Sequence, residues 1–240
     1  MLGMRDRPGG RDRPGQPVLP AGPGIGPGWM RRLLDVTVAG LTLLALWPLL
    51  LCVAVAALVS TKGSPIYRQR RVGQGGVAFT LLKFRTMRTK MPGPQVTPPG
   101  DLRVTRVGAL LRRTGIDELP QLLNVLAGKM TLVGPRPESV ALAVRYPPEC
   151  RFVFRYRPGL TGPSQVLEHD DWVLRQVPDV EGFYLTELVP RRVATDLKYL
   201  EHPTFARTVL WLANTVRYLA GADVPAREGR SRRSLTGLTR

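Results

Sequence analysis

The sequence predicts an α/β, mainly helical domain fused to a re-entrant membrane helix, which is the fold class of a monotopic membrane protein with one small β-hairpin. Three observations support it: residues 36–59 carry no charge, two extended runs flank a glycine-rich turn at 73–76, and leucines recur at helical spacing over 119–126. A chain of 240 residues with 23 prolines and 25 glycines leaves room for one compact domain beside the membrane segment.

Both ends of the chain have the composition of disordered tails. Residues 1–28 repeat Arg-Asp-Arg-Pro-Gly at 5–9 and 11–15 and then contain mainly glycine and proline, while residues 221–240 are basic. Such segments bury too little apolar surface to fold. The predicted organisation is therefore a tail at 1–28, a membrane helix at 29–62, a folded domain at 63–220 and a basic tail at 221–240.

The apolar run from Val36 to Val59 has about the length that crosses a bilayer, and it is too long and too far into the chain for a cleaved signal peptide. Basic residues stand on both flanks, so a spanning helix would place one basic flank on the wrong side. Pro48, directly after Trp47, removes a helical hydrogen bond near the middle. A proline-broken re-entrant helix is therefore favoured, with an ordinary spanning helix as the alternative. The flanking basic residues are Arg31, Arg32, Lys62, Arg68, Arg70 and Arg71.

The net charge of +17, from 35 Lys and Arg against 18 Asp and Glu, indicates polyanionic partners. The apolar segment favours an anionic lipid membrane as one of them, because basic residues beside such a segment gain about 1 kcal/mol each near an anionic leaflet. Nucleic acid is not expected, since neither zinc spacing nor an aromatic RNA-binding signature occurs. The cysteines Cys52 and Cys150 indicate neither a disulfide framework nor a metal site. Asp35 either pairs with the basic residues before it or lies in the headgroup layer.

Residues 66–70 and 79–87 are the predicted strands of the hairpin. In an extended run Lys83 and Arg85 share one face with Met87, while Leu82 and Phe84 take the other. One side of the hairpin is thus cationic and the other belongs to the core. A solvated basic face is the alternative interpretation of the cationic side.

A short helix near residues 107–111 is predicted to bring Arg112 toward two adjacent carboxylates, Asp117 and Glu118. These carboxylates open a second amphipathic helix, because Pro120 is tolerated only in a first turn. The positive end of a helix dipole favours ionised carboxylates and also bound phosphate. The arrangement indicates a site for phosphate chemistry, with an acidic helix cap as the alternative.

Arg136 lies between Pro135 and Pro137, which fix the local backbone and reduce the entropy lost when the guanidinium is ordered. Such an arginine suits a phosphate clamp. Residues 155–163 form a second rigid, cationic stretch of the same kind. Scaffolding is the alternative for both.

Four motifs occur in one order: Lys83-Phe84-Arg85-Thr86-Met87, Asp117-Glu118-Leu119-Pro120-Gln121-Leu122-Leu123-Asn124-Val125-Leu126, Val133-Gly134-Pro135-Arg136-Pro137, and Arg157-Pro158-Gly159-Leu160-Thr161-Gly162. With them, the chain from about Arg31 to about Thr215 resembles the bacterial sugar transferases called monotopic phosphoglycosyl transferases, in their minimal form. The resemblance implies transfer of a sugar-1-phosphate from a UDP-sugar to a polyprenyl (undecaprenyl) phosphate, with release of UMP and use of Mg²⁺.

The resemblance also implies roles for single residues. Asp117 corresponds to the nucleophile that forms a phosphosugar-aspartate intermediate, and Glu118 corresponds to the magnesium ligand. The candidates for contact with substrate phosphates are Lys83, Arg85, Arg112 and Arg136. The expected location is the cytoplasmic face of a bacterial inner membrane, at the start of surface glycan or exopolysaccharide synthesis. Two other function classes are a non-catalytic basic scaffold on the membrane and a tethered polyanion-binding protein.

Overall fold

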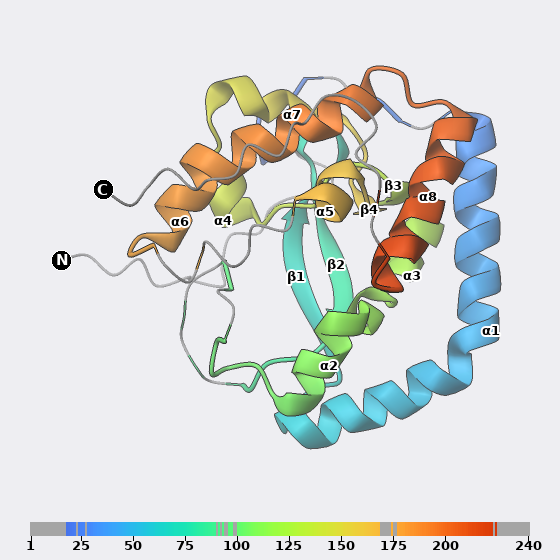
Figure 1. Ribbon diagram of the computed structural model, residues 1–240, viewed down its shortest axis with the longest axis vertical. Coiled ribbons are helices and arrows are strands. Elements are labelled where there is room, and N and C mark those ends of the chain that lie inside the picture. The colour runs from blue at the N-terminus through green and yellow to red at the C-terminus, as the bar shows by residue number, and fades with distance from the viewer. Residues whose placement is uncertain are drawn as a thin grey trace.

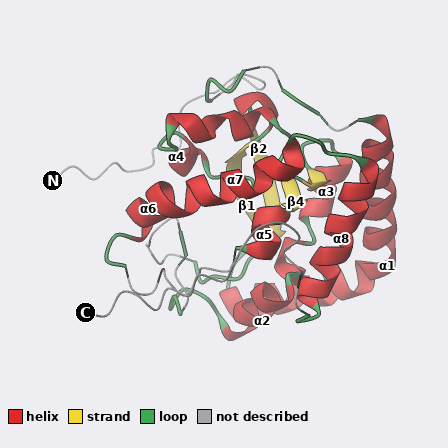
Figure 2. Cartoon of the chain, turned by 45° about the horizontal axis from the view of Figure 1, so that its top comes forward, coloured by secondary structure: helices red, strands yellow, loops and turns green. Residues whose placement is uncertain are grey.

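The computed structural model describes residues 18–222 and 224, except 23, 27, 90, 92, 94, 95, 98, 99, 169–173, 175 and 176. Most of the two predicted tails, residues 1–17 and 225–240, therefore lies outside the described residues. Helices enclose two small sheets in the part of the chain that is described (Figure 2).

The longest helix, α1 (Trp29–Thr61), bends sharply near its middle, so that one half runs beside α8 (Phe205–Leu219) and the other passes beneath α2 (Arg106–Thr114) (Figure 1). Pro48 lies inside this helix. Within the described residues, α1 is the one helix long and apolar enough to cross a membrane, and 11% of its most apolar window is buried. The bend agrees with the predicted interruption, whereas the placement of α1 in a membrane stays a prediction.

Asp35 ties the first half of α1 to the domain. It is 0% exposed, and its carboxylate accepts hydrogen bonds from the Thr131 hydroxyl at 2.7 Å and the Leu132 N–H at 2.9 Å. Buried carboxylates need such donors, because an unpaired one is costly to desolvate. These bonds correct both expectations for Asp35, which were pairing with Arg31 or Arg32 and a place in the headgroup layer.

The two arginines before Asp35 bind backbone carbonyls of the domain. Arg32 donates to the carbonyl oxygens of Val125 and Leu126 at 2.6 and 2.8 Å, at the end of the helix α3. Arg31 donates to the Val133 carbonyl at 3.2 Å. Carbonyls in the last turn of a helix lack partners within it, so Arg32 caps α3 from the first turn of α1.

The predicted hairpin is confirmed. The strands β1 (Ile66–Val72) and β2 (Ala78–Phe84) pair antiparallel, with Ile66 opposite Phe84. The second strand ends at Phe84 rather than at Met87, which forms an isolated bridge instead. Leu81 and Phe84 point to opposite faces and each is 3% exposed, so the cationic face of β2 is also covered. The basic face is therefore not a simple solvated surface.

The predicted helix that carries Arg112 is α2 (Arg106–Thr114). It packs directly on the backbone of Thr86, because a Cβ at Gly108 would lie 2.1 Å from the Thr86 carbonyl oxygen. The helix ends at Gly115, whose φ of 69° is the left-handed conformation that glycine adopts readily.

The second predicted helix is divided in two. Asp117 and Glu118 lie in a 3-10 turn, Ile116–Glu118, and α3 begins only at Gln121 and ends at Leu126. Pro120 stands at the N-cap of α3. The two carboxylates are therefore one turn ahead of the helix, and the turn rather than the helix fixes their direction.

The rest of the domain follows the hairpin and α3. Two strands that the sequence did not predict, β3 (Thr131–Val133) and β4 (Gly159–Thr161), pair in parallel at the centre. The remaining elements are 3-10 turns at Gln74–Gly76 and Pro148–Arg155, α4 (Val140–Ala143), α5 (Pro163–Leu167), α6 (Val180–Phe183), a π-helix at Tyr184–Leu188 and α7 (Val189–Leu200). One large core joins α1, β2, α3, β3 and α7.

The described part of the predicted N-terminal tail lies against the domain. The Val18 N–H donates to the Gly76 carbonyl at 2.9 Å, and the Ile25 N–H donates to the Arg155 carbonyl at 2.6 Å. Leu19 is 6% exposed in the core. The tail boundary expected at residue 28 is thus corrected, because a few apolar residues among the glycines and prolines are enough to hold this segment.

Candidate active site

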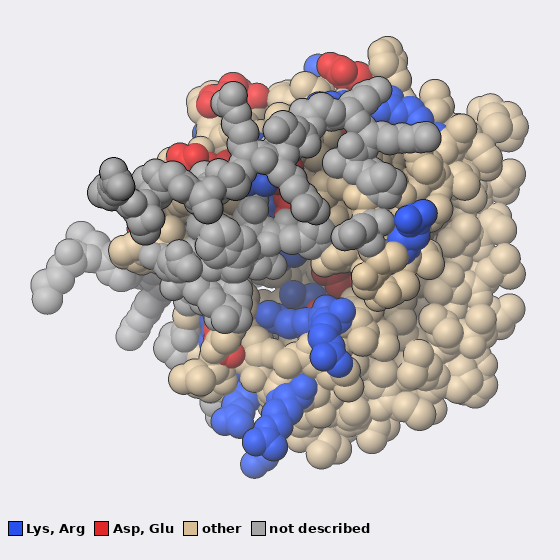
Figure 3. Space-filling view, in the orientation of Figure 1, with Lys and Arg blue, Asp and Glu red and all other residues tan. Residues whose placement is uncertain are grey.

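A small open pocket lies between the hairpin, the 3-10 turn at Ile116–Glu118 and the loop that carries Arg136. Three cations and one carboxylate face it, which suits an anionic ligand. Basic side chains gather around a small acidic area near the centre of this face (Figure 3). The pocket is lined by Arg71, Leu81, Lys83, Glu118, Gln121, Arg136, Pro137, Leu160 and Gln165.

Lys83 is a strongly desolvated cation of the pocket. Its pKa is lowered to about 8, mainly because burial disfavours the charged amine, and further because Arg71 and Arg112 repel it. Asp117 and Glu118 oppose this shift. A bound anion would stabilise the charged amine, so Lys83 is suited to contact phosphate oxygens.

Asp117 is buried, at 6% exposure. Its pKa is raised to about 6, first because of burial and second because the Glu118 carboxylate repels its charge, while Lys83 and Arg112 act in the opposite direction. At neutral pH the carboxylate is therefore largely ionised but poorly solvated. Such a carboxylate is a suitable nucleophile.

Asn124 joins the helix after the carboxylates to the strand that carries Lys83. Its side-chain oxygen accepts from the Leu82 N–H at 3.0 Å, and its amide nitrogen donates to the Thr80 carbonyl at 2.8 Å. The oxygen and the nitrogen of this side chain thus both bond to the backbone of β2. The sequence reasoning quoted Asn124 within a motif and gave it no role, whereas the structure shows that it fixes the spacing between the acidic turn and Lys83.

The other predicted phosphate contacts take three different positions. Arg136 is exposed at the pocket, where it donates to the Gln165 side chain at 3.4 Å. Arg112 donates to the Thr86 hydroxyl at 2.9 Å, and its charge acts on Asp117. Arg85 is not among the residues that line the pocket; it donates to the Ser64 carbonyl at 2.7 Å, near the end of α1.

The structure thus brings together Lys83, Glu118 and Arg136 in one pocket with Asp117 and Arg112 adjoining, and it leaves Arg85 to one side. Sequence reasoning missed two further residues of the pocket. Arg71 was treated only as part of a basic flank, although its spacing from Gln69 in an extended run would have placed both on one face. Gln165 gave no signal in the sequence.

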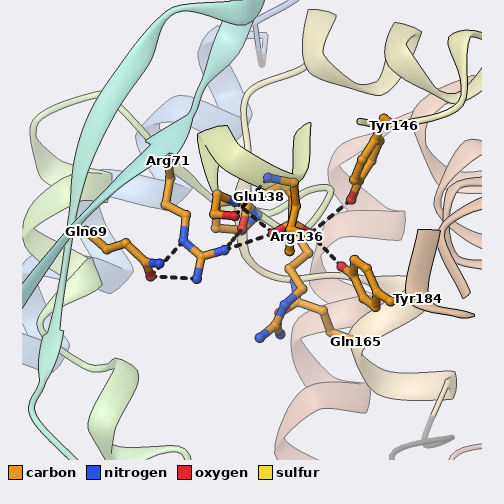
Figure 4. A network of polar contacts seen from close by, with 10 residues as sticks. Gln69, Arg71, Arg136, Glu138, Tyr146, Gln165 and Tyr184 are labelled. Atoms are coloured by element: carbon orange, nitrogen blue, oxygen red, sulfur yellow. Dashed lines mark hydrogen bonds and ion pairs between the residues drawn. The ribbon is translucent and has the colours of Figure 1, made fainter. Parts of the chain in front are cut away.

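The side-chain amide of Gln165 is suited to contact a ligand. Its Nε2 is buried and has no hydrogen-bond partner among the described residues. A buried donor without a partner is costly, so a ligand that accepts a hydrogen bond here would relieve that cost. This side chain projects from α5 next to Arg136 (Figure 4).

The acidic pair fits a magnesium ion. Across the described ranges, no group of three or more His, Cys, Asp or Glu side chains is arranged to hold a metal. Magnesium commonly takes only one or two protein carboxylates and fills its other positions with water and substrate phosphates. Asp117 and Glu118 repel each other in a partly desolvated site, and a divalent cation would offset their negative charge. The pair can therefore hold Mg²⁺ together with a phosphorylated substrate.

An acidic pair lies beside a basic pocket, on a domain that shares its core with a long apolar helix, and this arrangement is suited to phosphate chemistry. Comparison with known families agrees: the sequence model of the bacterial sugar transferases matches residues 27–221. The chain belongs to this family, which confirms the predicted resemblance and the transferase class.

Several characterised relatives are similar over long stretches. The UDP-glucose:undecaprenyl-phosphate glucose-1-phosphate transferase of Caulobacter vibrioides is 41% identical over 216 residues, which cover 88% of this chain and 76% of that protein. The protein of the same name from Escherichia coli is 39% identical over 71% of this chain, but the match spans only 36% of the relative. The exopolysaccharide production protein ExoY of Rhizobium meliloti is 39% identical over 60% of this chain and 71% of its own length.

Proposed function

We propose that this protein transfers a sugar-1-phosphate from a UDP-sugar to undecaprenyl phosphate, giving undecaprenyl-diphosphate-sugar and UMP. The observation that carries the proposal is the buried Asp117, which lies beside Glu118 next to a pocket with three cations. The names of the Caulobacter and Escherichia relatives support the donor and acceptor classes.

The proposed reaction has two displacement steps at one phosphorus. An Asp117 carboxylate oxygen attacks the sugar-bearing phosphorus of the donor, the bond from that phosphorus to the bridging oxygen breaks, and UMP leaves with the bonding electrons. A phosphate oxygen of the acceptor then attacks the same phosphorus, and the bond to Asp117 breaks. The covalent phosphosugar-aspartate divides one difficult transfer into two easier ones.

The basic residues act mainly through charge. A UDP-sugar resists attack because its phosphate oxygens are already anionic, and Lys83 and Arg136 would neutralise that charge in the pocket. Arg112 favours the ionised form of Asp117. Glu118, with Asp117 beside it, would hold Mg²⁺, which when bound supplies further charge neutralisation to the diphosphate. Arg85 keeps its predicted role as a phosphate contact on the side of the hairpin near α1.

We further propose that α1 dips into the cytoplasmic leaflet of the inner membrane and returns. Its bend and its outward apolar side chains support this, and Figure 3 shows an extended surface without charges along that side of the molecule. The most exposed apolar residues of α1 are Trp29, Leu33, Leu41, Leu44, Trp47, Leu51 and Val59.

Cysteine labelling tests this topology. In a background with Cys52→Ser and Cys150→Ser, single cysteines at positions 28 and 63 should both react from the cytoplasm and be protected from an impermeant periplasmic reagent. Pro48→Leu should restore helical continuity, worth about 3 kcal/mol, and should favour spanning. Periplasmic labelling at either wild-type flank would mean that an ordinary transmembrane helix anchors the domain.

The activity is tested by UMP release from membrane-reconstituted protein, with undecaprenyl phosphate and a panel of UDP-sugars. Magnesium-dependent UMP release that disappears in Asp117→Asn is the expected result. Folded protein that releases no UMP with any donor would favour the non-catalytic scaffold. A tethered polyanion-binding protein would instead show affinity that depends on salt and is indifferent to magnesium and UDP-sugar.

The name of the Rhizobium relative supports a place in exopolysaccharide production. Attachment of the first sugar phosphate to the lipid carrier is the step that commits a glycan to the membrane. We therefore assign the reaction to the start of surface glycan or exopolysaccharide synthesis.

A further inference from the structure

A buried carboxylate outside the predicted site, Glu138, is surrounded by donors (Figure 4). It is 3% exposed. One of its oxygens accepts from the hydroxyls of Tyr146 at 3.1 Å and Tyr184 at 2.5 Å. The other accepts from the Ser139 N–H at 2.7 Å and from Nη1 of Arg71 at 3.2 Å. Hydrogen bonds of this number hold a buried carboxylate in one orientation.

The two tyrosines are permanent donors to Glu138. Burial raises the pKa of both hydroxyls, and the adjacent Glu138 charge raises it further. Tyr184 is the first residue of a π-helix, a local widening that re-aims side chains and often occurs at functional sites. Both tyrosines therefore stay protonated throughout the physiological pH range, and both hydroxyls donate their hydrogen bonds to Glu138.

The guanidinium of Arg71 is the cation that this network holds. It also donates through Nη1 to the Pro137 carbonyl at 3.1 Å and through Nε and Nη2 to the Gln69 side chain at 3.1 and 2.7 Å. With the bond to Glu138, these bonds use four of the five N–H donors, so within the described residues one Nη2 hydrogen is left for a ligand.

Arg71 nevertheless faces the candidate active site. It lines the same pocket as Lys83 and Arg136, and it lies on the same face of the hairpin as Lys83, because Gln69 pairs with Leu81 and Tyr67 pairs with Lys83. The two strands of the hairpin and the distant loop that carries Arg136 thus each present one cation to a single pocket. The donor diphosphate carries one negative charge on each phosphate, and Arg71 adds a third cation to Lys83 and Arg136 in the pocket that would bind it.

We propose that Arg71 is a further binding residue for the donor diphosphate, and that Glu138, with Tyr146 and Tyr184, is the positioning group that holds its guanidinium toward the pocket. This inference rests on the proposed function. Because the guanidinium is already ordered before the ligand binds, little side-chain entropy is lost on binding.

Binding of UDP to the full chain in nanodiscs, measured by calorimetry with Mg²⁺ present, tests this directly and needs no turnover. Arg71→Gln should weaken UDP binding by about tenfold to hundredfold, the range of a hydrogen bond to a charged group. Arg68→Gln is the matched control, because Arg68 is an exposed residue of the same strand on the opposite face, and its UDP affinity should stay within about twofold.

Arg71→Gln leaves Glu138 buried without its cation, which alone can destabilise the fold. The double variant Arg71→Gln/Glu138→Gln removes both charges and avoids this. Its melting temperature should be close to that of wild type while UDP affinity stays low. Glu138→Gln alone should weaken UDP binding in the same direction but less, and the double variant should be no worse than Arg71→Gln, because both changes act on one contact.

In the UMP-release assay the same variants should raise KM for the donor more than they lower kcat, and Arg71→Lys should recover part of the loss. A double variant that binds UDP as tightly as wild type, or a wild type that does not bind UDP, overturns the role of Arg71. A wild type that binds UDP through Arg71 but releases no UMP with any donor overturns the proposed function and leaves the binding role standing.

Discussion

Asp117 and Asp196 are buried to a similar degree, at 6% and 3% exposure, and burial is the main cause that raises the pKa of each, to about 6 and about 7. Their neighbours differ. The two oxygens of Asp196 accept hydrogen bonds from the N–H and the hydroxyl of Ser164, each at 2.9 Å. Asp117 instead has Lys83 and a second carboxylate beside it.

The difference shows that a raised pKa alone does not identify a reactive carboxylate. Asp196 is satisfied by neutral donors and fastens α5 to α7, so its burial stabilises structure. Asp117 adjoins a cationic pocket, where its burial would serve the proposed chemistry. The hydrogen bonds from Ser164 and the position beside the pocket separate the two cases, since each carboxylate also has a cation and a second carboxylate nearby.

The largest effect should come from removing the nucleophile. Asp117→Asn should lower UMP release by about 10⁴-fold or more, because the amide keeps the shape but cannot attack phosphorus. Asp196→Asn should retain most of the activity per folded molecule. Wild type incubated with labelled UDP-sugar and no acceptor should carry label on the protein, and Asp117→Asn should not. Substantial turnover by Asp117→Asn, or no adduct with any donor, would refute the covalent route.

The second effect concerns Glu118, the carboxylate that follows Asp117 in the chain. Glu118→Gln should shift the magnesium titration of activity to about tenfold higher concentration or more, since an anionic ligand of a hard cation is lost. Glu201→Gln, an exposed glutamate at the end of α7, is the control. An unchanged titration for Glu118→Gln would move the metal role to another residue.

The third effect belongs to the structural carboxylate. Asp196→Ala should lower the free energy of unfolding by about 1–3 kcal/mol, because the Ser164 N–H is left buried without an acceptor. That loss corresponds to roughly 2–4 °C in melting temperature per kcal/mol for a domain of this size. Thermal unfolding in detergent measures it. Lost activity with an unchanged melting temperature would place Asp196 in the active site instead.

The smallest effect is a shift along the pH axis. Because the pKa of Asp117 is raised to about 6 and only its ionised form attacks, kcat/KM should rise with pH and level off above about 6. Glu118→Gln removes the second cause of the raised pKa, so the rising limb should move to lower pH. Asp196→Asn should leave the rising limb at the same pH, although burial raises the pKa of Asp196 to about 7. A rising limb that shifts in Asp196→Asn would instead identify Asp196 as the reactive carboxylate and Asp117 as the structural one.

Local patterns in the sequence predicted the hairpin, the helix that carries Arg112 and the acidic pair of Asp117 and Glu118. In each case the signal lies within a few neighbouring residues, as spacing, turn residues or paired charges. Arg85 does not line the pocket, but it shares the predicted face with Lys83, since both cations lie 5.5 Å from the centre of the Tyr67 ring.

Contacts between distant parts of the chain could not be predicted in this way. Glu138 lies 67 residues from Arg71, and Leu132 lies 97 residues from Asp35. The residues next to each of these positions in the sequence give no signal that identifies its distant partner. The strands β3 and β4 are three residues each, which is too short to show a period of two.

The bonds that join α1 to the domain decide how a water-soluble form could be engineered. Asp35, Ala39, Val53, Ala57 and Thr61 are buried, so α1 is a part of the core and not a detachable anchor. Deleting residues 29–62 would leave the Leu132 N–H and the carbonyls at the end of α3 without their partners, and α3 is the helix that follows the acidic pair. Solubility is better sought by replacing the outward leucines of α1 with glutamate or lysine while Arg32 and Asp35 are kept, so that the scaffold survives without the lipid.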